Sequence, residues 1–392
     1  MNGSRDDSDM TPRNILFFVS SLKIGGAELH LLNLCRYLAA RGTRLSVCVL
    51  DPGTGLRGRF EESGAMIHEL PIGSLRDIAR PSVRKRIREI VAAAAPDIIH
   101  AHLYHAEIVA AVASGISGVP LVVTRHSSGL EFNGSRRIAA SIAGRWIRRV
   151  IAVSSQAAEE AAGLGAPRDS VVTIPNGVDT SRFRPLEPVL RESERARIID
   201  EHFPATGGQE ALIVGSVSGL KPVKNLSLLV KAFSSLVSSG TDNARLLIVG
   251  EGPSREELEA LVSRLGLEDR VSLPGYSERP GEYLPILDLF VLPSLSEGIP
   301  MAMLEAMSSG LACAASRVGG IPELLGDCGL TFESGDLEGL AGTMRQLAAD
   351  APLREDLGRR ARVRAMEFFD MEIWGSRTVA VYEELAGSRD RN

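Results

Sequence analysis

Short apolar runs alternate with longer amphipathic segments along most of the chain. Six runs of strand character occur in the first half, at residues 15–19, 45–50, 97–100, 121–124, 150–153 and 171–174. The segments between them carry apolar residues at helical spacing. Because strands that alternate with helices are joined by crossovers into parallel sheets, the pattern predicts an α/β fold whose sheets are covered by helices.

The same rhythm returns after an interruption. The pattern lapses in a Pro- and charge-rich stretch, 182–204, and resumes with apolar runs at 211–217, 245–249, 270–273, 289–292 and 311–315. This doubling predicts two Rossmann-like domains, residues 1–185 and 186–369, that face each other across a central cleft. Ligands of such sheets bind at the carboxyl ends of the strands, so we expect site residues there.

Length and composition agree with a globular protein of two domains. The 392 residues are too many for one ordinary core, and the chain is 44% hydrophobic and 24% charged. No apolar run approaches the roughly 20 residues that span a bilayer, and residues 1–11 lack an apolar signal-peptide segment. We therefore expect a cytoplasmic protein. The four cysteines lack metal-ligand spacing, so we expect them to be reduced: Cys35, Cys48, Cys313 and Cys328.

The net charge of −5 hides an uneven distribution. Residues 1–185 carry 23 Lys and Arg against 17 Asp and Glu, whereas the remainder carries 21 against 32. We expect the first half to be the one that meets an anionic surface or acceptor, and we expect no nucleic-acid partner. Its basic residues gather in two stretches, Arg76, Arg80, Arg84, Lys85, Arg86 and Arg88, and Arg136, Arg137, Arg145, Arg148 and Arg149 around Trp146. Two interpretations stay open: an ordinary solvated helix face, which is favoured, and peripheral contact with an anionic membrane.

The stretch with the most specific chemistry is 294–307. Glu297 and Glu305 lie eight residues apart around Gly298 and Pro300, between a strand-like run and a helical run of Ala, Met and Leu. Pro300 suits the first helical position, and Gly298 lets the backbone come close to a ligand. The start of a helix favours phosphate oxygens, while carboxylates accept hydrogen bonds from sugar or ribose hydroxyls. A helix with two solvated glutamates is the less favoured alternative.

This stretch resembles the E-x7-E motif of retaining glycosyltransferases of the GT-B architecture, especially those of family 4. The resemblance extends over nearly the whole chain. It implies that Glu305 contacts the nucleotide ribose, that Glu297 contacts the transferred sugar, and that Gly298, Ile299 and Pro300 belong to the donor site. It also implies that no metal is required.

Residues 215–225 predict a phosphate site, because a strand, a Gly-containing loop and a helix start follow one another there. The resemblance places a phosphate-binding lysine at Lys224. Many relatives carry an arginine where this chain has Gly219. Lys221 can supply the missing charge but cannot reproduce a bidentate guanidinium contact, so a weaker donor site is one expectation. A solvated lysine near a helix start is the alternative for Lys224.

Three further turns of the second half are of interest. We interpret 249–253, with its Gly-x-Gly, as a structural turn. The segment 273–276, which ends at Tyr276, resembles the family segment whose backbone meets the nucleotide base. Residues 319–323 resemble a recurrent G-G-x-P-E turn, in which Glu323 is either a helix-start acid or a functional group.

In the first half, Gly25 and Gly26 follow the first strand and precede Glu28 and a long amphipathic helix. Paired glycines at such a turn allow a close approach of the backbone to a ligand. They resemble the family's G-G-A-E loop, which implies a place beside the donor phosphates and the acceptor. The turn is not the G-x-G-x-x-G of dinucleotide enzymes, which disfavours a dehydrogenase. Glu28 can alternatively serve the first turn of its helix.

Four of the seven histidines gather after two neighbouring strands: His100, His102, His105 and His126. His102 and His126 stand at strand ends, where site residues are expected. Residues 124–126 resemble a T-x-H segment, which implies that His126 contacts the sugar or the acceptor. Zinc binding is an alternative, but no predicted helix carries an i, i+4 pair and no cysteine accompanies them, so we expect no metal site.

These features together predict a metal-independent retaining glycosyltransferase of the GT-B fold. It would move a sugar from a nucleotide-diphosphate sugar to a saccharide or lipid-linked acceptor, without a cofactor, in the synthesis of surface polysaccharide or glycoconjugate. We expect Lys224, Glu297 and His126 to be the catalytic residues. The resemblance also implies a C-terminal helix, 370–392, that packs back on the first domain, and a lipid-linked acceptor would place the protein at the inner face of the membrane.

Two alternatives remain at this stage. A nucleotide-sugar epimerase of the same architecture would isomerise its donor and need no acceptor. A non-catalytic sugar-nucleotide binder would hold the nucleotide without consuming the sugar, and Gly219 keeps that interpretation open.

Overall fold

The computed structural model describes residues 12–53, 55–126, 134–204 and 211–387. The chain divides into two compact units, one formed by Met1–Asn176 with Glu372–Asn392 and the other by Gly177–Met371. We call them the N-terminal unit and the C-terminal unit.

The N-terminal unit is built on seven parallel strands in the order β3-β2-β1-β4-β5-β6-β7. The strands are β1 (Asn14–Ser21), β2 (Arg44–Asp51), β3 (Met66–Glu69), β4 (Ile98–His102), β5 (Leu121–Arg125), β6 (Ile147–Ala152) and β7 (Val171–Thr173). The helices are α1 (Gly26–Ala39), α2 (Arg57–Glu62), α3 (Pro81–Ala94), α4 (Tyr104–Ser117), α5 (Gly134–Ala143), α6 (Ser155–Gly163) and α14 (Met371–Gly387). The strand order reverses between β1 and β4, which makes the carboxyl ends of these strands the expected place for a ligand.

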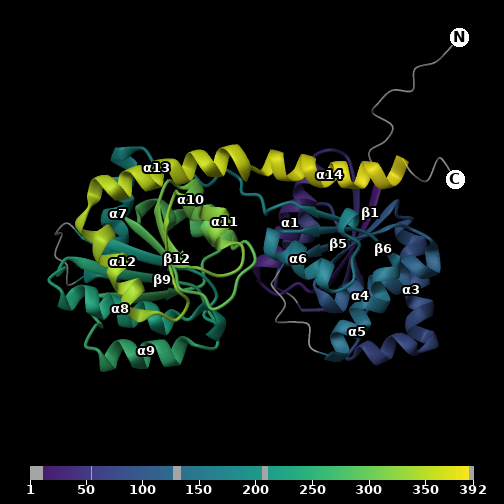
Figure 1. Ribbon diagram of the computed structural model, residues 1–392, viewed down its shortest axis with the longest axis horizontal. Helices are drawn as coiled ribbons and strands as arrows, with labels where there is room; N and C mark the ends of the chain where they lie inside the picture. Colours follow the sequence, from purple (N-terminus) through teal and green to yellow (C-terminus); the bar gives the residue numbers. More distant parts are fainter. Residues whose placement is uncertain (1–11, 54, 127–133, 205–210, 388–392) are drawn as a thin grey trace, which may run out of the picture. The chain divides into compact units, whose positions relative to one another are not determined.

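The C-terminal unit is built on six parallel strands in the order β10-β9-β8-β11-β12-β13. The strands are β8 (Leu212–Val217), β9 (Ala244–Val249), β10 (Val271–Gly275), β11 (Leu289–Leu292), β12 (Ala312–Ser316) and β13 (Leu330–Phe332). The helices are α7 (Pro188–His202), α8 (Leu226–Ser238), α9 (Arg255–Arg264), α10 (Met301–Ser308), α11 (Ile321–Leu325), α12 (Leu337–Ala349) and α13 (Ala351–Phe368). In Figure 1, β9 and β12 lie between α8 and α9 on one side and α10 and α13 on the other.

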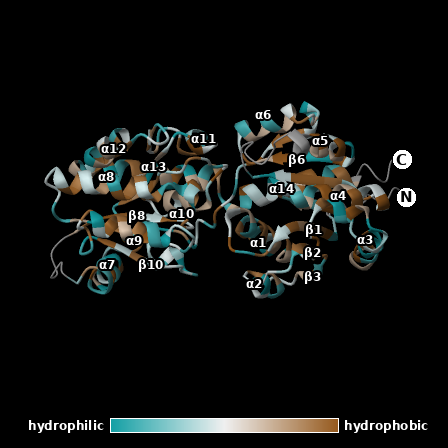
Figure 2. Cartoon of the chain, turned by 90° about the horizontal axis from the view of Figure 1, so that it is seen from below, coloured by the Kyte–Doolittle hydropathy of each residue, from teal (hydrophilic) through white to brown (hydrophobic). Residues whose placement is uncertain are grey.

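Each unit has a hydrophobic core of its own. In the N-terminal unit, β1, β4 and β5 pack against α3 and α4, whereas in the C-terminal unit β8, β9 and β11 pack against α8, α9 and α12. The central strands are apolar on both faces because helices cover both faces, and Figure 2 shows them brown. The two parallel sheets confirm the predicted α/β class and the pair of Rossmann-like domains.

Two edge strands are absent from the sequence prediction. Strand β3 has four residues and β13 has three, and each has partly exposed positions. Such short segments at a sheet edge lack the continuous apolar run that marks the central strands.

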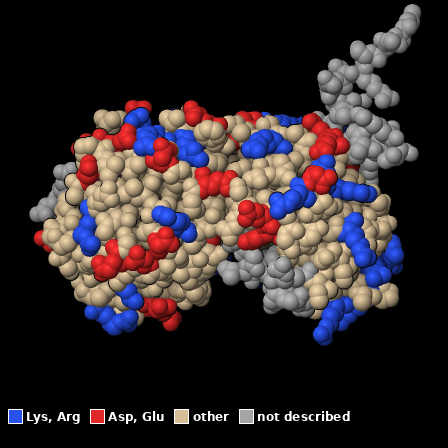
Figure 3. Space-filling model, in the orientation of Figure 1, with Lys and Arg blue, Asp and Glu red and all other residues tan. Residues whose placement is uncertain are grey.

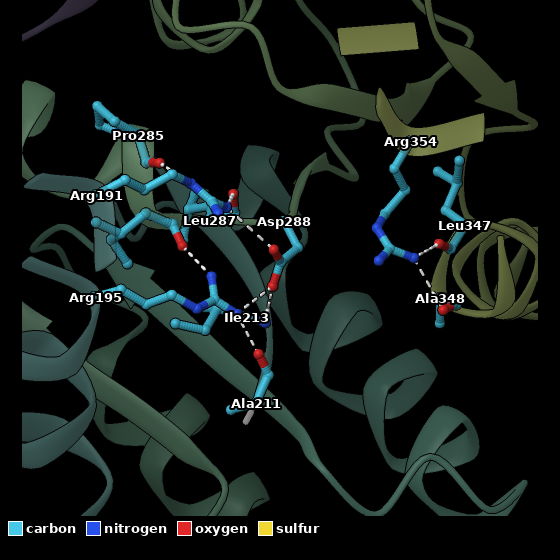
Figure 4. Close-up of polar contacts among 11 residues, drawn as sticks. Arg191, Arg195, Ala211, Ile213, Pro285, Leu287, Asp288, Leu347, Ala348 and Arg354 are labelled. Carbon is cyan, nitrogen blue, oxygen red and sulfur yellow. Dashed lines mark hydrogen bonds and ion pairs between the residues drawn. The ribbon is translucent and has the colours of Figure 1, made fainter. Parts of the chain in front are cut away.

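The charge-rich stretch 182–204, predicted as an interruption of the pattern, contains helix α7. Its Pro188 stands in the first turn, where a missing N–H has no cost. Arg191 and Arg195, one helical turn apart, both point at Asp288 just before β11, as Figure 4 shows. The Asp288 carboxylate also accepts a hydrogen bond from the backbone N–H of Ile213 at 2.8 Å. The charges that suggested an irregular segment therefore fix a helix to the sheet.

The division between the units falls at Asn176, before the boundary at residue 185 expected from the sequence. The reason is backbone pairing after Asn176. Val178 donates to the carbonyl of Phe369 at 2.8 Å and accepts from the N–H of Met371 at 3.0 Å. The hydroxyl of Ser308 also donates to the carbonyl of Phe183 at 2.6 Å. Residues 177–185 thereby belong to the C-terminal unit. The two segments that connect this unit to the N-terminal unit, near Val178 and near Met371, pair with each other.

Helix α14 packs in the N-terminal unit. Trp374, Thr378 and Tyr382 are buried there, and Gly375 lies so close to the ring of Tyr37 that a Cβ would approach it to 2.3 Å. Within the described part of the chain, no helix combines the length and the apolar character that crossing a membrane requires.

Candidate functional site

Lys224 and Glu297 are in direct contact at the carboxyl ends of two adjacent strands. The Lys224 ammonium lies 2.6 Å from Oε1 of Glu297, and the hydroxyl of Ser294 donates to the same oxygen at 2.6 Å. Lys224 follows β8 in a short 3-10 turn, and Asn225 after it takes a left-handed conformation with φ of 49°. Glu297 follows β11, which pairs with β8. Lys224, predicted to bind the phosphate, and Glu297, predicted to contact the sugar, are thus in contact with each other.

The loop that carries Glu297 and Gly298 is shaped by the turn at 319–323. The N–H of Gly320 donates to the carbonyl of Gly298 at 2.9 Å. Gly319 has φ of 57°, and a Cβ there would lie 1.8 Å from the carbonyl oxygen of Glu297. A side chain at this position would displace the loop. Glu323 lies in the first turn of α11.

Helix α10 begins one residue later than predicted. Pro300 has an extended ψ of 125° and is the residue before the helix, so Met301 is the first helical residue. Ile299 and Pro300 are buried, and the helix is apolar on most of its surface. Its first amides have no acceptor within the helix, and they favour an anion near Gly298.

Glu305 lies on the second turn of α10 and is largely buried. Burial raises the pKa of this carboxyl to about 7, an effect that Arg182 partly opposes. Among the described residues, no side chain or backbone group forms a hydrogen bond or ion pair with its carboxylate. A carboxylate without a protein partner on a half-buried residue suits a ligand hydroxyl.

The loop after β8 brings Gly219 and Lys221 beside the turn between β9 and α9. Cβ atoms at Gly250 and Gly252 would lie 1.9 Å and 2.4 Å from the carbonyl oxygens of Ser218 and Leu220. Gly250 and Gly252 therefore have the structural role expected of them. Gly219 differs from both, because a Cβ there would meet atoms only at 3.8 Å or more. Lys221 is exposed.

Tyr276 follows β10 and is 43% exposed, directly after Gly275, whose φ is 97°. It is not part of the contacts among Lys224, Glu297 and Ser294. It follows β10, whereas those residues follow β8 and β11. Its assignment to the nucleotide base remains a prediction.

At the start of α1, Gly25 is the residue before the helix and Gly26 is its first residue. A Cβ at Gly25 would lie 2.4 Å from a carboxylate oxygen of Glu28, which would have to shift, whereas Gly26 has open space around it. The backbone of Gly25 is extended, with φ of −159°, so its conformation does not require glycine. Glu28 is buried and occupies the first turn of the helix, the alternative that the sequence left open.

His102 and His126 meet at the ends of the adjacent strands β4 and β5. A hydrogen bond of 2.9 Å joins Nδ1 of His102 and Nε2 of His126. Burial lowers the pKa of His126 to about 4, and burial together with neighbouring imidazoles lowers that of His102 well below its ordinary value. Leu103, which follows His102, has φ of 73°, an unfavourable conformation for leucine that reverses the chain at the strand end.

The other two histidines of the sequence cluster have different surroundings, although the ring centroid of His100 is 4.3 Å from that of His102. His100 is buried between the hydroxyl of Tyr382, 2.6 Å from Nδ1, and that of Thr124, 2.8 Å from Nε2. His105 is exposed beside Tyr104. His100 therefore connects α14 to the sheet, and both of its ring nitrogens are hydrogen bonded outside the His102–His126 pair.

His30 is the residue that the sequence did not single out. It lies on α1 and is buried, and the centroid of its ring is 4.7 Å from that of His126 and 5.8 Å from that of His102. Its one signal in the sequence is a histidine within the apolar run 29–35 of an amphipathic helix. A buried polar residue in such a run needs a partner, but the pattern does not say which one.

The first basic stretch lies on the exposed surface of α3 and the turn before it, where Figure 3 shows blue side chains gathered. The opposite side of α3 packs in the core, where Ile87, Ile90 and Val91 are buried. In the second stretch, Arg149 pairs with Glu384, while Arg145, Trp146 and Arg148 are exposed. The side chains of Arg136 and Arg137 lie outside the described residues.

Two family models match this chain, one in each half. The model of Glycosyltransferase Family 4 matches residues 24–182, and that of Glycosyl transferases group 1 matches residues 199–364. N-acetyl-alpha-D-glucosaminyl L-malate synthase of Bacillus anthracis is 28% identical over 375 residues, which cover 92% of this chain and 94% of that protein. D-inositol 3-phosphate glycosyltransferase of Streptomyces avermitilis is 26% identical, with 91% and 82% covered.

Among solved structures, that of Anabaena HepE in complex with UDP superimposes with a TM-score of 0.82 and 24% identity, over 95% of this chain and all of HepE. The two family matches follow each other along the chain and leave only 183–198 between them. The protein therefore belongs to the glycosyltransferases of the GT-B fold, with a family 4 domain followed by a group 1 domain.

Proposed function

We propose that this glycosyltransferase moves a sugar from a nucleotide-diphosphate sugar to a saccharide or lipid-linked acceptor, with retention of configuration and without a metal. The observation that supports it most directly is the ion pair between Lys224 and Glu297, whose charged atoms are 2.6 Å apart. Glu297 lies in the loop before α10, and Glu305, whose carboxylate has no partner among the described residues, lies on that helix. A cation, two carboxylates and helix amides match a ligand that joins phosphates to hydroxyl-rich sugars.

The ion pair defines how the site would respond to a donor. Without a ligand, the charge of Lys224 is balanced by Glu297. A diphosphate competes for the ammonium, with the first amides of α10 as further donors, and the Glu297 carboxylate becomes available to the sugar hydroxyls. Glu305 would accept from the ribose, and the backbone near Tyr276 would meet the base. We assign Lys221 a supporting role on the phosphates, because Gly219 supplies no guanidinium.

In the proposed reaction the bond between the anomeric carbon and the diphosphate oxygen breaks, and the acceptor hydroxyl bonds to the same face of that carbon. The proton of the acceptor passes to the leaving phosphate. Lys224 and the amides near Gly298 stabilise the charge that grows on the diphosphate, which is the largest catalytic contribution expected of such a site. We assign His126 to the transferred sugar or the acceptor, with His102 supporting it through their hydrogen bond. Gly25 and Gly26 would let the backbone approach the phosphates or the acceptor.

The test is a donor panel on metal-free protein. UDP-, GDP- and ADP-sugars are compared by thermal shift and by release of nucleotide, and UDP-glucose, with which HepE has been crystallised, is the first member of the panel. We expect one nucleotide class to stabilise the wild type and both Lys224→Ala and Glu305→Ala to abolish the shift. Lys231→Ala, an exposed lysine on α8, is the matched control and should behave as wild type.

Turnover separates the proposed transferase from the other enzymes of this architecture. Nucleotide release that depends on an added acceptor, with an α-linked product from an α-linked donor by NMR, supports a retaining transfer. An isomerised donor without acceptor would show an epimerase, and nucleotide binding without any sugar consumption would show a binding protein. Either result would overturn the proposal.

We also propose that the protein works in the cytoplasm at the inner face of a membrane, in surface polysaccharide or glycoconjugate synthesis. The support is a row of exposed apolar side chains, Ile138, Ile142 and Trp146, which are 65%, 51% and 39% exposed and spaced four residues apart along α5 and the turn after it. The exposed Arg145 and Arg148 flank Trp146. Apolar side chains flanked by arginine suit the interface of an anionic bilayer.

Sedimentation with vesicles of phosphatidylglycerol and phosphatidylcholine tests the contact. We expect binding at low salt that Ile138→Ser with Ile142→Ser weakens and that pure phosphatidylcholine does not support. Met66→Ser, another exposed apolar residue, is the control. No binding at low salt would overturn the membrane contact and leave the transferase proposal intact.

A further inference from the structure

Three imidazoles from three separate elements converge in the N-terminal unit. His30 comes from α1, His102 from the end of β4 and His126 from the residue after β5. One possible ligand atom from each lies within 4.8 Å of those of the other two, in an arrangement that belongs to one unit alone. The transfer proposed above gives no role to His30.

All three side chains of the cluster are imidazoles, and the neutral imidazole is a common protein ligand of transition metals. Burial lowers the pKa of each of them below the ordinary value.

One buried nitrogen in the cluster lacks a protein partner. Nδ1 of His102 is hydrogen bonded to His126, but Nε2 of His102 is buried and has no hydrogen-bond partner among the described residues. Whichever tautomer the pair adopts, a polar atom is left without a partner, which is costly in a protein interior. A coordinated ion would remove this cost.

The surroundings resemble those of histidine-based metal sites. Asn176 lies against the imidazole of His30 and acts on its pKa. The rings of Trp374 and Phe17 pack against His30 and His102, with centroids 4.7 Å and 6.0 Å apart, and they limit access of water. Ligand atoms of a tetrahedral zinc ion lie roughly 3.3 Å apart, and the three candidate atoms lie within 4.8 Å of one another, so ligation requires the rings to move closer.

We propose that His30, His102 and His126 bind one divalent transition metal ion of the zinc class. Imidazole ligands suit Zn²⁺, Ni²⁺, Cu²⁺ and Co²⁺ and are poor ligands for Mg²⁺ and Ca²⁺, which prefer oxygen. Three protein ligands leave a coordination position open to water or to a ligand hydroxyl. The ion is an addition to the proposed transfer, which does not need it.

Binding has a consequence that rests on the proposed function. His126 cannot both coordinate an ion and hydrogen bond to a sugar through the same nitrogen. Micromolar zinc is therefore expected to inhibit transfer, and a chelator to restore it. Because binding is measured without a sugar substrate, its outcome stands whether or not the protein proves to be a transferase.

The test uses full-length protein without a histidine tag, dialysed free of metal. Zn²⁺ is titrated against a chromophoric chelator, and Co²⁺ serves as a spectroscopic probe. We expect one Zn²⁺ per chain, the visible absorption of four-coordinate Co²⁺, and no effect of excess Mg²⁺ on either. His30→Gln and His102→Gln should each weaken Zn²⁺ binding at least about tenfold.

His105→Gln is the matched control, because His105 is exposed and lies outside the cluster. It should bind as wild type. The described cysteines are buried, and burial raises the pKa of their thiols, so they are poor competing ligands. If a cluster variant fails to fold, X-ray absorption of the wild-type Co²⁺ complex still counts the imidazole ligands. Absence of stoichiometric binding, equal binding by folded His30→Gln, or fewer than three imidazoles would overturn the proposal.

Discussion

The surroundings of the Glu305 carboxyl group disfavour its charged form and raise its pKa. Its pKa of about 7 in the folded protein lies above the ordinary value of 4.5. Between these two values the folded state holds the proton more tightly than the unfolded state does. The contribution of this group to stability is therefore full below about pH 4.5 and is lost as the pH rises to 7.

Glu305→Gln removes this titration. We expect the variant to be more stable than wild type at pH 8, by about 1–3 kcal/mol, and the difference to shrink toward zero at pH 5. Urea unfolding of both proteins at the two pH values measures it. Glu278→Gln, at an exposed position, should show no such pH dependence. A difference for Glu305→Gln that is equal at pH 5 and pH 8 would contradict the assignment to the buried carboxyl.

Gly219 and Gly250 lie near each other, but only at Gly250 does the packing exclude a side chain. Gly250 is pressed against the carbonyl oxygen of Ser218, whereas Gly219 has room for a side chain. We expect Gly250→Ala to destabilise the protein by about 1–3 kcal/mol and Gly219→Ala to be nearly neutral. Chemical unfolding checks both. Equal losses would show that the loop at Gly219 is as closely packed as the turn it faces.

The open space at Gly219 allows a larger side chain to be introduced that strengthens nucleotide binding. Gly219→Arg places a guanidinium in the loop that carries Lys221 and Lys224, and we expect about a threefold to tenfold tighter Kd for the nucleotide diphosphate. Gly219→Gln, which adds an uncharged polar side chain, is the control. Calorimetric titration decides, and no difference between the two variants would mean that the loop does not face the phosphates.

The sequence predicted the candidate site unevenly. Lys224, Glu297 and His126 could be placed because each follows a central strand, and His102 because it ends one. In each sheet the carboxyl ends of the parallel strands share one edge. The contact between Lys224 and Glu297 depends on side-chain conformations that spacing does not determine. His30 comes from a helix face, where an isolated histidine has no periodic signal, and only the packing of α1 brings it to His126.

At the scale of elements, α7 is fixed to its unit by charge. Asp288 is 16% exposed, and it accepts from Arg191, from Arg195 and from the backbone N–H of Ile213. Arg195 also donates to the carbonyl of Ile286. It donates to that of Ala211 as well (Figure 4). The arrangement bridges α7, β8 and the residues before β11.

Asp288→Ala leaves two arginines without their shared carboxylate. We expect a loss of about 2–4 kcal/mol, because removing one partner of a largely buried pair leaves an uncompensated charge. Glu194→Ala, which removes an exposed ion pair with Arg197 on the same helix, should leave the Tm nearly unchanged. Thermal unfolding by circular dichroism compares them. A Tm for Asp288→Ala equal to that of Glu194→Ala would mean that α7 is held by its apolar contacts alone.

Elements that bury a continuous apolar face were predictable, and those held by other means were not. The central strands and helix α10 stand out in the sequence, since their apolar residues have a period or an unbroken run. Helix α7 has few apolar residues and is held by Arg191 and Arg195. Strands β3 and β13 are short and lie at the sheet edges, where pairing with one neighbour suffices.

At the scale of the whole molecule, the chain forms two cores that share no strand. The N-terminal core is completed by α14 from the end of the chain, and the C-terminal core lies entirely within 177–371. The junction could not be placed exactly from the sequence, because it depends on the backbone pairing of Val178 with residues 369–371. Separate cores can unfold separately.

We therefore expect two calorimetric transitions, of which a bound nucleotide raises one. Lys224, Glu297 and Glu305 all lie in the C-terminal unit, so a nucleotide at 100 times its Kd should stabilise that unit by about 2.7 kcal/mol. Hydrogen exchange assigns the transitions through peptides from 211–371 and from 12–126. Lys224→Ala should remove the shift, while Lys231→Ala should keep it. A single transition that moves as a whole with nucleotide would show that the two cores unfold as one cooperative unit.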